Sequence, residues 1–177
     1  MHTACLSLGS NVDPARHIAI AFAALRERFG DIRASAAYRT PAVGFEGADF
    51  VNAAAVIESD LDVLALNDWL HALEDAHGRD RSGPRFGDRT LDIDIVLFDD
   101  LVCSGPGNLR LPRGELRHAF VLRPLAEIAP ETVEPVSGLS LAALWEASGE
   151  REVAMEVVSL PALPATGRHI PDAGAVL

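Results

Sequence analysis

A strict alternation of aliphatic and acidic residues, Leu-Asp-Ile-Asp-Ile at positions 91–95, constrains the fold more than any other feature of the chain. A period of two indicates a β-strand with one buried face. Because successive strand side chains point to opposite faces, Asp92 and Asp94 share one face and the aliphatic side chains pack on the other. Two residues of strand separate the bases of these carboxylates by roughly 6.5 Å. That spacing suits one or two divalent cations, about 4 Å apart, over a phosphate chain, and a solvated strand face is the alternative.

The segment before this strand, residues 79–89, supplies positive charge. Its arginines are Arg79, Arg81, Arg85 and Arg89. Arginine forks beside two acids on a strand favour polyphosphate chemistry. A solvated surface loop is the alternative for each arginine, and Arg89 is the strongest functional candidate because it adjoins the acidic strand. We expect this loop to become ordered on nucleotide binding and to exclude water.

Composition limits both the partner and the kind of phosphate site. The net charge of -11 argues against nucleic acid as a partner. All 15 cationic residues are arginine, so a lysine-dependent P-loop and Schiff-base chemistry are excluded. Any phosphate must then be bound by arginine side chains, backbone N–H groups or metal ions.

Length, cysteine usage and apolar runs bound the organisation of the chain. The 177 residues suffice for one domain with a hydrophobic core. We place this domain at 1–159 and expect a loosely structured tail at 160–177. Cys5 and Cys103 lack metal-type spacing and are typical of reduced cysteines in a cytoplasmic protein. Neither a signal peptide nor a run of about 18 apolar residues is visible, so we expect no membrane association. We also expect the protein to be a monomer.

Hydrophobic periodicity and turn residues predict a β-α-β-β-α-β order. The strands are expected at 4–8, 32–38, 50–57 and 90–98, a short strand at 101–103, and short later helices at 120–127 and 139–147. The first main helix should start at Asp13-Pro14 and stop at Gly30. The second should be capped by Asp60 or Asp62. This order predicts an α+β fold with a ferredoxin-like split βαβ core and a C-terminal extension.

Six motifs occur in an order that resembles one family. They are LSLGSN at 6–11, YRTPAVG at 38–44, DFVNAA at 49–54, EDAHGR at 74–79, RTLDIDIVLF at 89–98 and AFVLRPLAEIAP at 119–130. The chain resembles the 6-hydroxymethyl-7,8-dihydropterin pyrophosphokinases of folate biosynthesis. The resemblance implies an αβα sandwich on a ferredoxin-like core. It also implies transfer of pyrophosphate from ATP to the hydroxymethyl oxygen of the reduced pterin, with two Mg²⁺ ions and release of AMP.

The resemblance also assigns roles to individual residues. The metal ligands would be Asp92 and Asp94, which act in catalysis together with Arg81 and Arg89. The pterin site would comprise Thr40, Pro41 and Val43 through their backbone, Asn52 at the ring edge, and Phe50 and Phe120 on either side of the ring. The ATP site would comprise His71, Glu74, Arg81, Arg89, Ile95, Arg113, Arg117 and His118.

Two segments depart from the family pattern. Phe86 and Asp88 stand where the family carries tryptophan and proline before the aspartate strand. Before Phe120, the family has a Pro-His pair and an arginine, for which Arg113 and Arg117 are the candidate replacements. The alternatives to an active pyrophosphokinase are a divergent paralogue that binds pterin or nucleotide with little transfer, and a metal-dependent phosphohydrolase.

Overall fold

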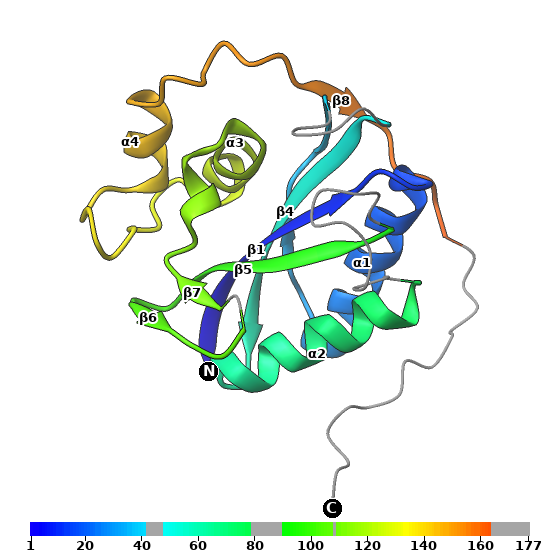
Figure 1. Cartoon of the computed structure of the whole chain (residues 1–177), viewed down its shortest axis with the longest axis horizontal. Helices are drawn as coiled ribbons and strands as arrows, with labels where there is room; N and C mark the ends of the chain where they lie inside the picture. The colour runs from blue at the N-terminus through cyan, green and yellow to red at the C-terminus, as the bar shows by residue number, and fades with distance from the viewer. Residues whose placement is uncertain (42–47, 79–89, 108, 164–177) are drawn as a thin grey trace, which may run out of the picture.

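An antiparallel sheet forms the centre of the molecule (Figure 1). The computed structural model describes residues 1–41, 48–78, 90–107 and 109–163 of the chain. The strands run in the order β5 (Asp92–Phe98), β1 (His2–Ser10), β4 (Phe50–Ser59), β3 (Ala37–Thr40) and β8 (Glu156–Val158), and β2 (Arg33–Ala34) also pairs with β4. Every pairing in this sheet is antiparallel. The long strands β1 and β4 are the centre to which the other strands are added.

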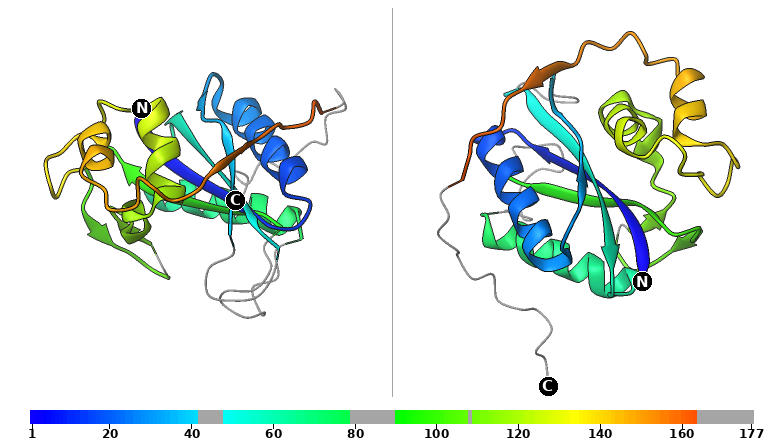
Figure 2. Two further views of the ribbon diagram at one scale, coloured as in Figure 1. Left: turned by 90° about the horizontal axis from the view of Figure 1, so that it is seen from above. Right: turned by 180° about the vertical axis from the view of Figure 1, so that it is seen from behind.

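Helices cover both faces of the sheet, as the two views of Figure 2 show. On one face α1 (Pro14–Phe29) and α2 (Val63–Ala76) enclose the larger apolar core, which includes Leu6, Ile57 and Ile95. On the other face α3 (Ala119–Ile128) and α4 (Leu141–Glu146) enclose a second core around Val96. The predicted αβα sandwich with its β-α-β-β-α-β order is therefore confirmed.

The two main helices start where the sequence predicts, but only α2 has a side chain that makes a capping hydrogen bond at its N-terminus. Asp62, not Asp60, caps α2, because its carboxylate accepts a hydrogen bond from the N–H of Ala65 at 2.8 Å. Asp13 stands at the N-cap of α1 in a left-handed conformation, with φ of 44°, and its side chain makes no capping bond. The predicted helix start at Asp13-Pro14 is therefore confirmed, although the Asp13 side chain does not cap the helix. Gly30 ends α1 with φ of 78°, a value that favours glycine.

The predicted strand at 32–38 is divided into β2 and β3. At the break, the Ser35 hydroxyl accepts a hydrogen bond from the N–H of Ala54 at 2.8 Å, which replaces a backbone acceptor. The N–H of Ala36 turns away from β4 and donates to the Glu127 carboxylate at 2.9 Å. The Tyr38 hydroxyl donates to the same carboxylate. Glu127 on α3 therefore ties the helix to β3 and explains why the strand is interrupted.

The later part of the chain adds elements that periodicity did not place. The strand predicted at 101–103 is β6 (Cys103–Ser104), which pairs with β7 (Arg110–Leu111) in a small separate sheet. A 3-10 turn, η1 (Gly114–Arg117), leads into α3. The C-terminal extension crosses back to place β8 against β3. The proposed tail begins two residues after β8, and residues 164–177 lie outside the described part.

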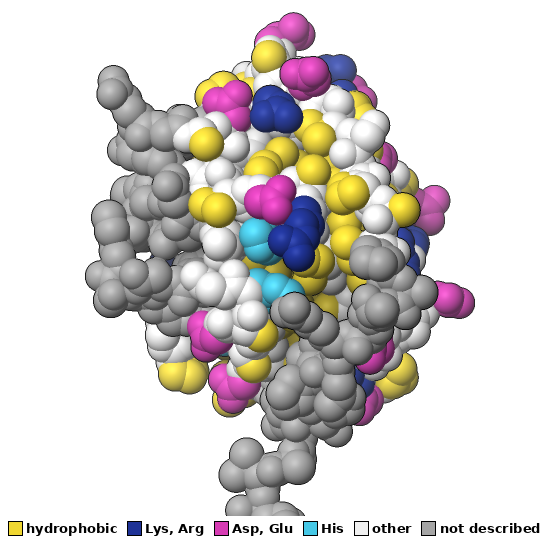
Figure 3. All heavy atoms as spheres, turned by 90° about the vertical axis from the view of Figure 1, so that its right-hand side faces the viewer, with side chains coloured by type: hydrophobic (Ala, Val, Ile, Leu, Met, Phe, Trp, Pro, Cys, Tyr) yellow, Lys and Arg dark blue, Asp and Glu magenta, His cyan; other side chains and the backbone are white. Residues whose placement is uncertain are grey.

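The surface in Figure 3 mixes apolar, basic, acidic and histidine side chains, as is typical of a solvated face. Within the described ranges, none of the helices has the length and apolar character needed to cross a membrane.

Candidate functional site

The register of the sheet places the predicted metal and pterin residues in one row. Gly9 of β1 lies opposite Asp92 of β5 on one side and opposite Asn52 of β4 on the other. Residues that are paired in register share a face, so Asp92 and Asn52 project on the same side of the sheet. Gly9 contributes no side chain between them. The result is a row with a carboxylate at one edge, an amide at the other and the half-buried Gly9 between them.

The predicted orientation of the acidic strand is confirmed. Ile93 and Ile95 are 2% and 1% exposed and belong to the core beneath α1 and α2. Asp92 and Asp94 alternate with them and are half-buried on the opposite face. Any contact of Ile95 with a nucleotide would therefore have to come from its backbone.

Close packing orients the Asn52 amide. The Asn52 side-chain nitrogen donates to the Thr40 hydroxyl at 2.7 Å, and Asn52 is 6% exposed. A Cβ atom added to Gly9 would lie 3.1 Å from the Asn52 oxygen and 3.9 Å from Cδ1 of Phe50. The predicted first strand ends at Leu8, but β1 continues to Ser10, so Gly9 lies inside the strand. A glycine within a strand often marks close approach of another group, and that signal was available in the sequence.

Electrostatics at Asp94 favour the approach of a cation. The pKa of Asp94 is raised to about 7, mainly by burial and then by the neighbouring charge of Asp92. The guanidinium of Arg113 opposes this shift, because its Nη2 lies 3.2 Å from Oδ1 of Asp94. The Nε of Arg113 lies 3.3 Å from Oε2 of Glu115. The structure therefore brings Arg113, a predicted ATP residue, directly to a predicted metal ligand.

The donor set fits Mg²⁺ only together with ligands from outside the described residues. Asp92 and Asp94 offer carboxylate oxygens on one face, and these hard ligands suit Mg²⁺. Among the described residues, no group of three or more His, Cys, Asp or Glu side chains could hold a metal ion. Mg²⁺ commonly binds one or two carboxylates and takes its other ligands from substrate phosphates and water.

Glu74 has a structural contact that its sequence did not reveal. It is 1% exposed on α2, and its Oε1 accepts a hydrogen bond from the N–H of Ile93 at 2.7 Å. This N–H lies between the two aspartates, so Glu74 braces the backbone that carries them. His71, three residues earlier on the same helix, is exposed. The predicted contacts of both residues with ATP stay predictions.

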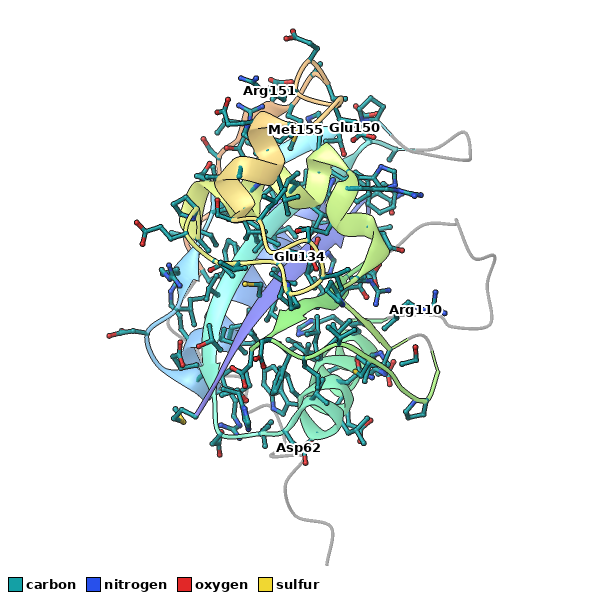
Figure 4. All side chains as sticks on the ribbon, turned by 90° about the vertical axis from the view of Figure 1, so that its left-hand side faces the viewer. Asp62, Arg110, Glu134, Glu150, Arg151 and Met155 are labelled. Atoms are coloured by element: carbon teal, nitrogen blue, oxygen red, sulfur yellow. The ribbon has the colours of Figure 1, made fainter. Side chains whose placement is uncertain are left out.

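The start of α3 joins His118 and Phe120 to the C-terminal extension. The rings of His118 and Phe120 stack at 5.3 Å with an interplanar angle of 10°. Glu150 accepts hydrogen bonds from the N–H of Ala119 at 2.6 Å and lies 3.1 Å from Nδ1 of His118. Figure 4 labels Glu150 in the segment that follows α4. Nothing in the sequence signalled this contact, because 31 residues separate Glu150 from Ala119.

Some of the remaining predicted site residues lie within the described part of the chain, and the others lie outside it. Phe50, at the start of β4, and Phe120, in the first turn of α3, are half-buried and lie on the side of the sheet that α3 covers. Thr40 ends β3 and is buried, the adjoining Pro41 is exposed, and Arg117 is exposed in η1. Val43, Arg81 and Arg89, like Phe86 and Asp88, lie outside the described residues, so their roles stay predictions.

The chain is similar to known proteins over most of its length. The family model described as 7,8-dihydro-6-hydroxymethylpterin-pyrophosphokinase matches residues 5–130. Relatives named 2-amino-4-hydroxy-6-hydroxymethyldihydropteridine pyrophosphokinase include one from Synechocystis sp., which is 35% identical over 82% of this chain and 75% of its own. The relative from Haemophilus influenzae is 35% identical over 77% of this chain and 88% of its own. The relative from Methylorubrum extorquens is 41% identical over 75% of this chain and 86% of its own.

Solved structures support the fold independently. A triple mutant of Plasmodium falciparum HPPK-DHPS superposes with a TM-score of 0.65 over 82% of this chain, at 14% sequence identity. The wild-type protein gives a TM-score of 0.61 over 83% of this chain, at 16% identity. The chain spans only 41% and 43% of these two solved chains. From the matched residues and the similar relatives, the chain belongs to the 7,8-dihydro-6-hydroxymethylpterin-pyrophosphokinase family.

Proposed function

We propose that the protein transfers the pyrophosphoryl group of ATP to the hydroxymethyl oxygen of 6-hydroxymethyl-7,8-dihydropterin and releases AMP. Membership of the family makes it a pyrophosphokinase of folate biosynthesis with ATP as co-substrate. The observation that carries the proposal is the row of Asp92, Gly9 and Asn52 across three adjacent strands. In this row a carboxylate that would suit phosphate chemistry lies on one side of Gly9, and an amide that would suit a heterocycle edge lies on the other.

The pterin end of the row suits a flat, polar heterocycle. The Asn52 amide offers a donor and an acceptor, which matches the alternating groups on a pterin edge. Its bond to Thr40 holds the amide in one orientation before the substrate arrives. Phe50 and Phe120 would supply aromatic faces for the ring. The backbone groups of Thr40, Pro41 and Val43 would complete the contacts.

The acidic end of the row would hold the phosphates. Asp92 and Asp94 would bind Mg²⁺, two ions in the full site, and the metal when bound neutralises charge on the transferred group. Arg81, Arg89 and Arg113 would bind phosphate oxygens by charge-assisted hydrogen bonds. Arg117, His118, His71 and Glu74 would contact the nucleotide from η1, the start of α3 and α2.

The chemistry places modest demands on acid–base catalysis. In a loose transition state, bond formation to the acceptor oxygen lags behind departure of the leaving group, so the hydroxyl needs little activation. Orientation and electrostatic stabilisation by the residues named above then provide most of the rate enhancement. We expect the enzyme to act as a monomer on small-molecule substrates in the cytoplasm.

A product assay tests the proposal. With ATP, Mg²⁺ and the hydroxymethyl-dihydropterin, AMP and the pterin diphosphate should form in equal amounts. Replacing Asp92 by alanine should abolish this turnover while leaving the circular dichroism spectrum unchanged, and full activity would contradict the metal assignment. Consumption of ATP without pterin would identify a phosphohydrolase. Tight pterin binding by calorimetry without AMP would identify a binding paralogue.

A further inference from the structure

We infer that Arg113 is the resident counter-ion of Asp94 in the metal-free protein and exchanges this carboxylate for a nucleotide phosphate when Mg²⁺ binds. The inference rests on the proposed function, because it takes Asp94 as a metal ligand. It adds an ordering to the site: metal alone should bind weakly, and nucleotide should strengthen metal binding by removing a competing cation.

The first observation is the contact itself. The Nη2 atom of Arg113 lies 3.2 Å from Oδ1 of Asp94, and the Arg113 side chain is only 19% exposed. A guanidinium against this oxygen occupies a position that a metal ion on Asp94 would need. Two cations on one carboxylate repel each other, so the arginine weakens the binding of a metal ion to Asp94.

The second observation is that the guanidinium is held mainly by charge. Its Nε is buried and makes no hydrogen bond of good geometry, although Oε2 of Glu115 lies 3.3 Å away. A buried donor without a well-formed bond is unfavourable, so this arrangement leaves binding capacity unused. A phosphate can accept paired hydrogen bonds from an arginine fork, and this offers the side chain a better partner than it has in the metal-free protein.

The third observation is that the backbone of Arg113 is fixed beside β5. Its N–H donates to the carbonyl of Val96 at 3.0 Å, next to the acidic end of the strand. Leu111, two residues earlier, is 2% exposed in the larger core. The exchange therefore needs rotation of a long side chain about an anchored Cα atom, and no rearrangement of the sheet.

These observations predict positive coupling between metal and nucleotide. Without nucleotide, Arg113 neutralises Asp94 and weakens metal binding. With nucleotide present, the phosphates draw the guanidinium away and supply further metal ligands. The two ligands then strengthen one another's binding by the same factor.

The experiment measures binding of Mn²⁺, a spectroscopic substitute for Mg²⁺, to the full chain by electron paramagnetic resonance. Wild type is compared with Arg113→Gln, with and without a non-hydrolysable ATP analogue. The matched control is Arg110→Gln, which removes the same charge from an exposed position three residues away (Figure 4). Without analogue, Arg113→Gln should bind Mn²⁺ about tenfold more tightly than wild type or Arg110→Gln, a typical size for coupled sites. The strengthening by analogue should shrink by the same factor.

Unchanged or weaker Mn²⁺ binding in analogue-free Arg113→Gln would overturn the inference, since a residue that only binds phosphate or supports the fold cannot strengthen metal binding when removed. Arg113→Lys keeps the charge and should bind Mn²⁺ as weakly as wild type does. If Arg113→Lys instead bound Mn²⁺ as tightly as is expected for Arg113→Gln, the inference would also be overturned. Failure of the proposed function gives a different result. In that case Asp94→Asn would bind Mn²⁺ with analogue as well as wild type does.

Discussion

Gly9→Ala tests whether close packing across the central strand shapes the pterin site. The backbone of β1 is extended at this position, so alanine needs no unusual dihedral angles. The conflict comes from the new methyl group, which would lie 3.1 Å from the Asn52 oxygen. Relief requires a shift of a few tenths of an ångström. The 2.7 Å bond from Asn52 to Thr40 resists that shift.

The expected effect separates binding from stability. Overpacking at this mild level costs about 1 kcal/mol, and replacing a strand glycine by alanine regains about 0.5–1 kcal/mol, so unfolding should be almost unchanged. A displaced Asn52 amide would lose a pterin hydrogen bond worth about 0.5–1.5 kcal/mol, or up to about tenfold in affinity. Pterin affinity should therefore fall by about fivefold, the middle of this range, while the affinity for ATP stays within about twofold.

Calorimetric titration with the pterin and with an ATP analogue, together with thermal unfolding, measures these quantities. Gly149→Ala is the matched control, because a Cβ atom there would meet nothing within 4 Å. Wild-type pterin affinity in Gly9→Ala would refute the reasoning. An equal loss of affinity for both ligands would also refute it, because the effect would then not be local to Asn52.

Two further predictions concern the acidic strand. Glu74→Ala leaves the buried N–H of Ile93 without its acceptor and should lower the free energy of unfolding by about 3 kcal/mol, or the melting temperature by roughly 6–12 °C. Glu74→Gln keeps an acceptor and should lose less than half as much. An unchanged melting temperature in Glu74→Ala would contradict the bracing role. Burial, and then the charge of Asp92, raise the pKa of Asp94 from 3.8 to about 7, so folding favours the protonated carboxyl and stability is lost as the pH rises through this interval. In the metal-free protein, Asp94→Asn should flatten the decline of melting temperature between these pH values, and an unaltered slope would argue against a raised pKa.

The strand that carries the aspartates was predictable because its information is local. Alternation over 91–95 is a property of adjacent residues, and β5 places Ile93 and Ile95 in the core as this pattern requires. The order of the main elements followed from similar local signals. Asp13 shows the limit of such signals, since its residue type suits an N-cap but its left-handed conformation leaves the side chain without a capping bond.

The candidate site was predictable only in part. Asp92 and Asn52 were identified from motifs 40 residues apart, and their common face followed from strand periodicity. Their alignment on either side of Gly9 depends on the register of two strand pairings, which periodicity along one strand does not specify. The buried acceptor role of Glu74 could not be predicted for the same reason, because its partner is on another element.

The sequence by itself determined the order of the main strands and helices, and which chemical groups the acidic strand presents, because these depend on neighbouring residues and on the geometry of a single element. The tertiary structure decided where distant segments meet. It placed Arg113 against Asp94, Glu150 at the start of α3, and β8 on β3. Such contacts arise from packing and charge pairing between residues that are far apart in the chain, and no local pattern encodes them.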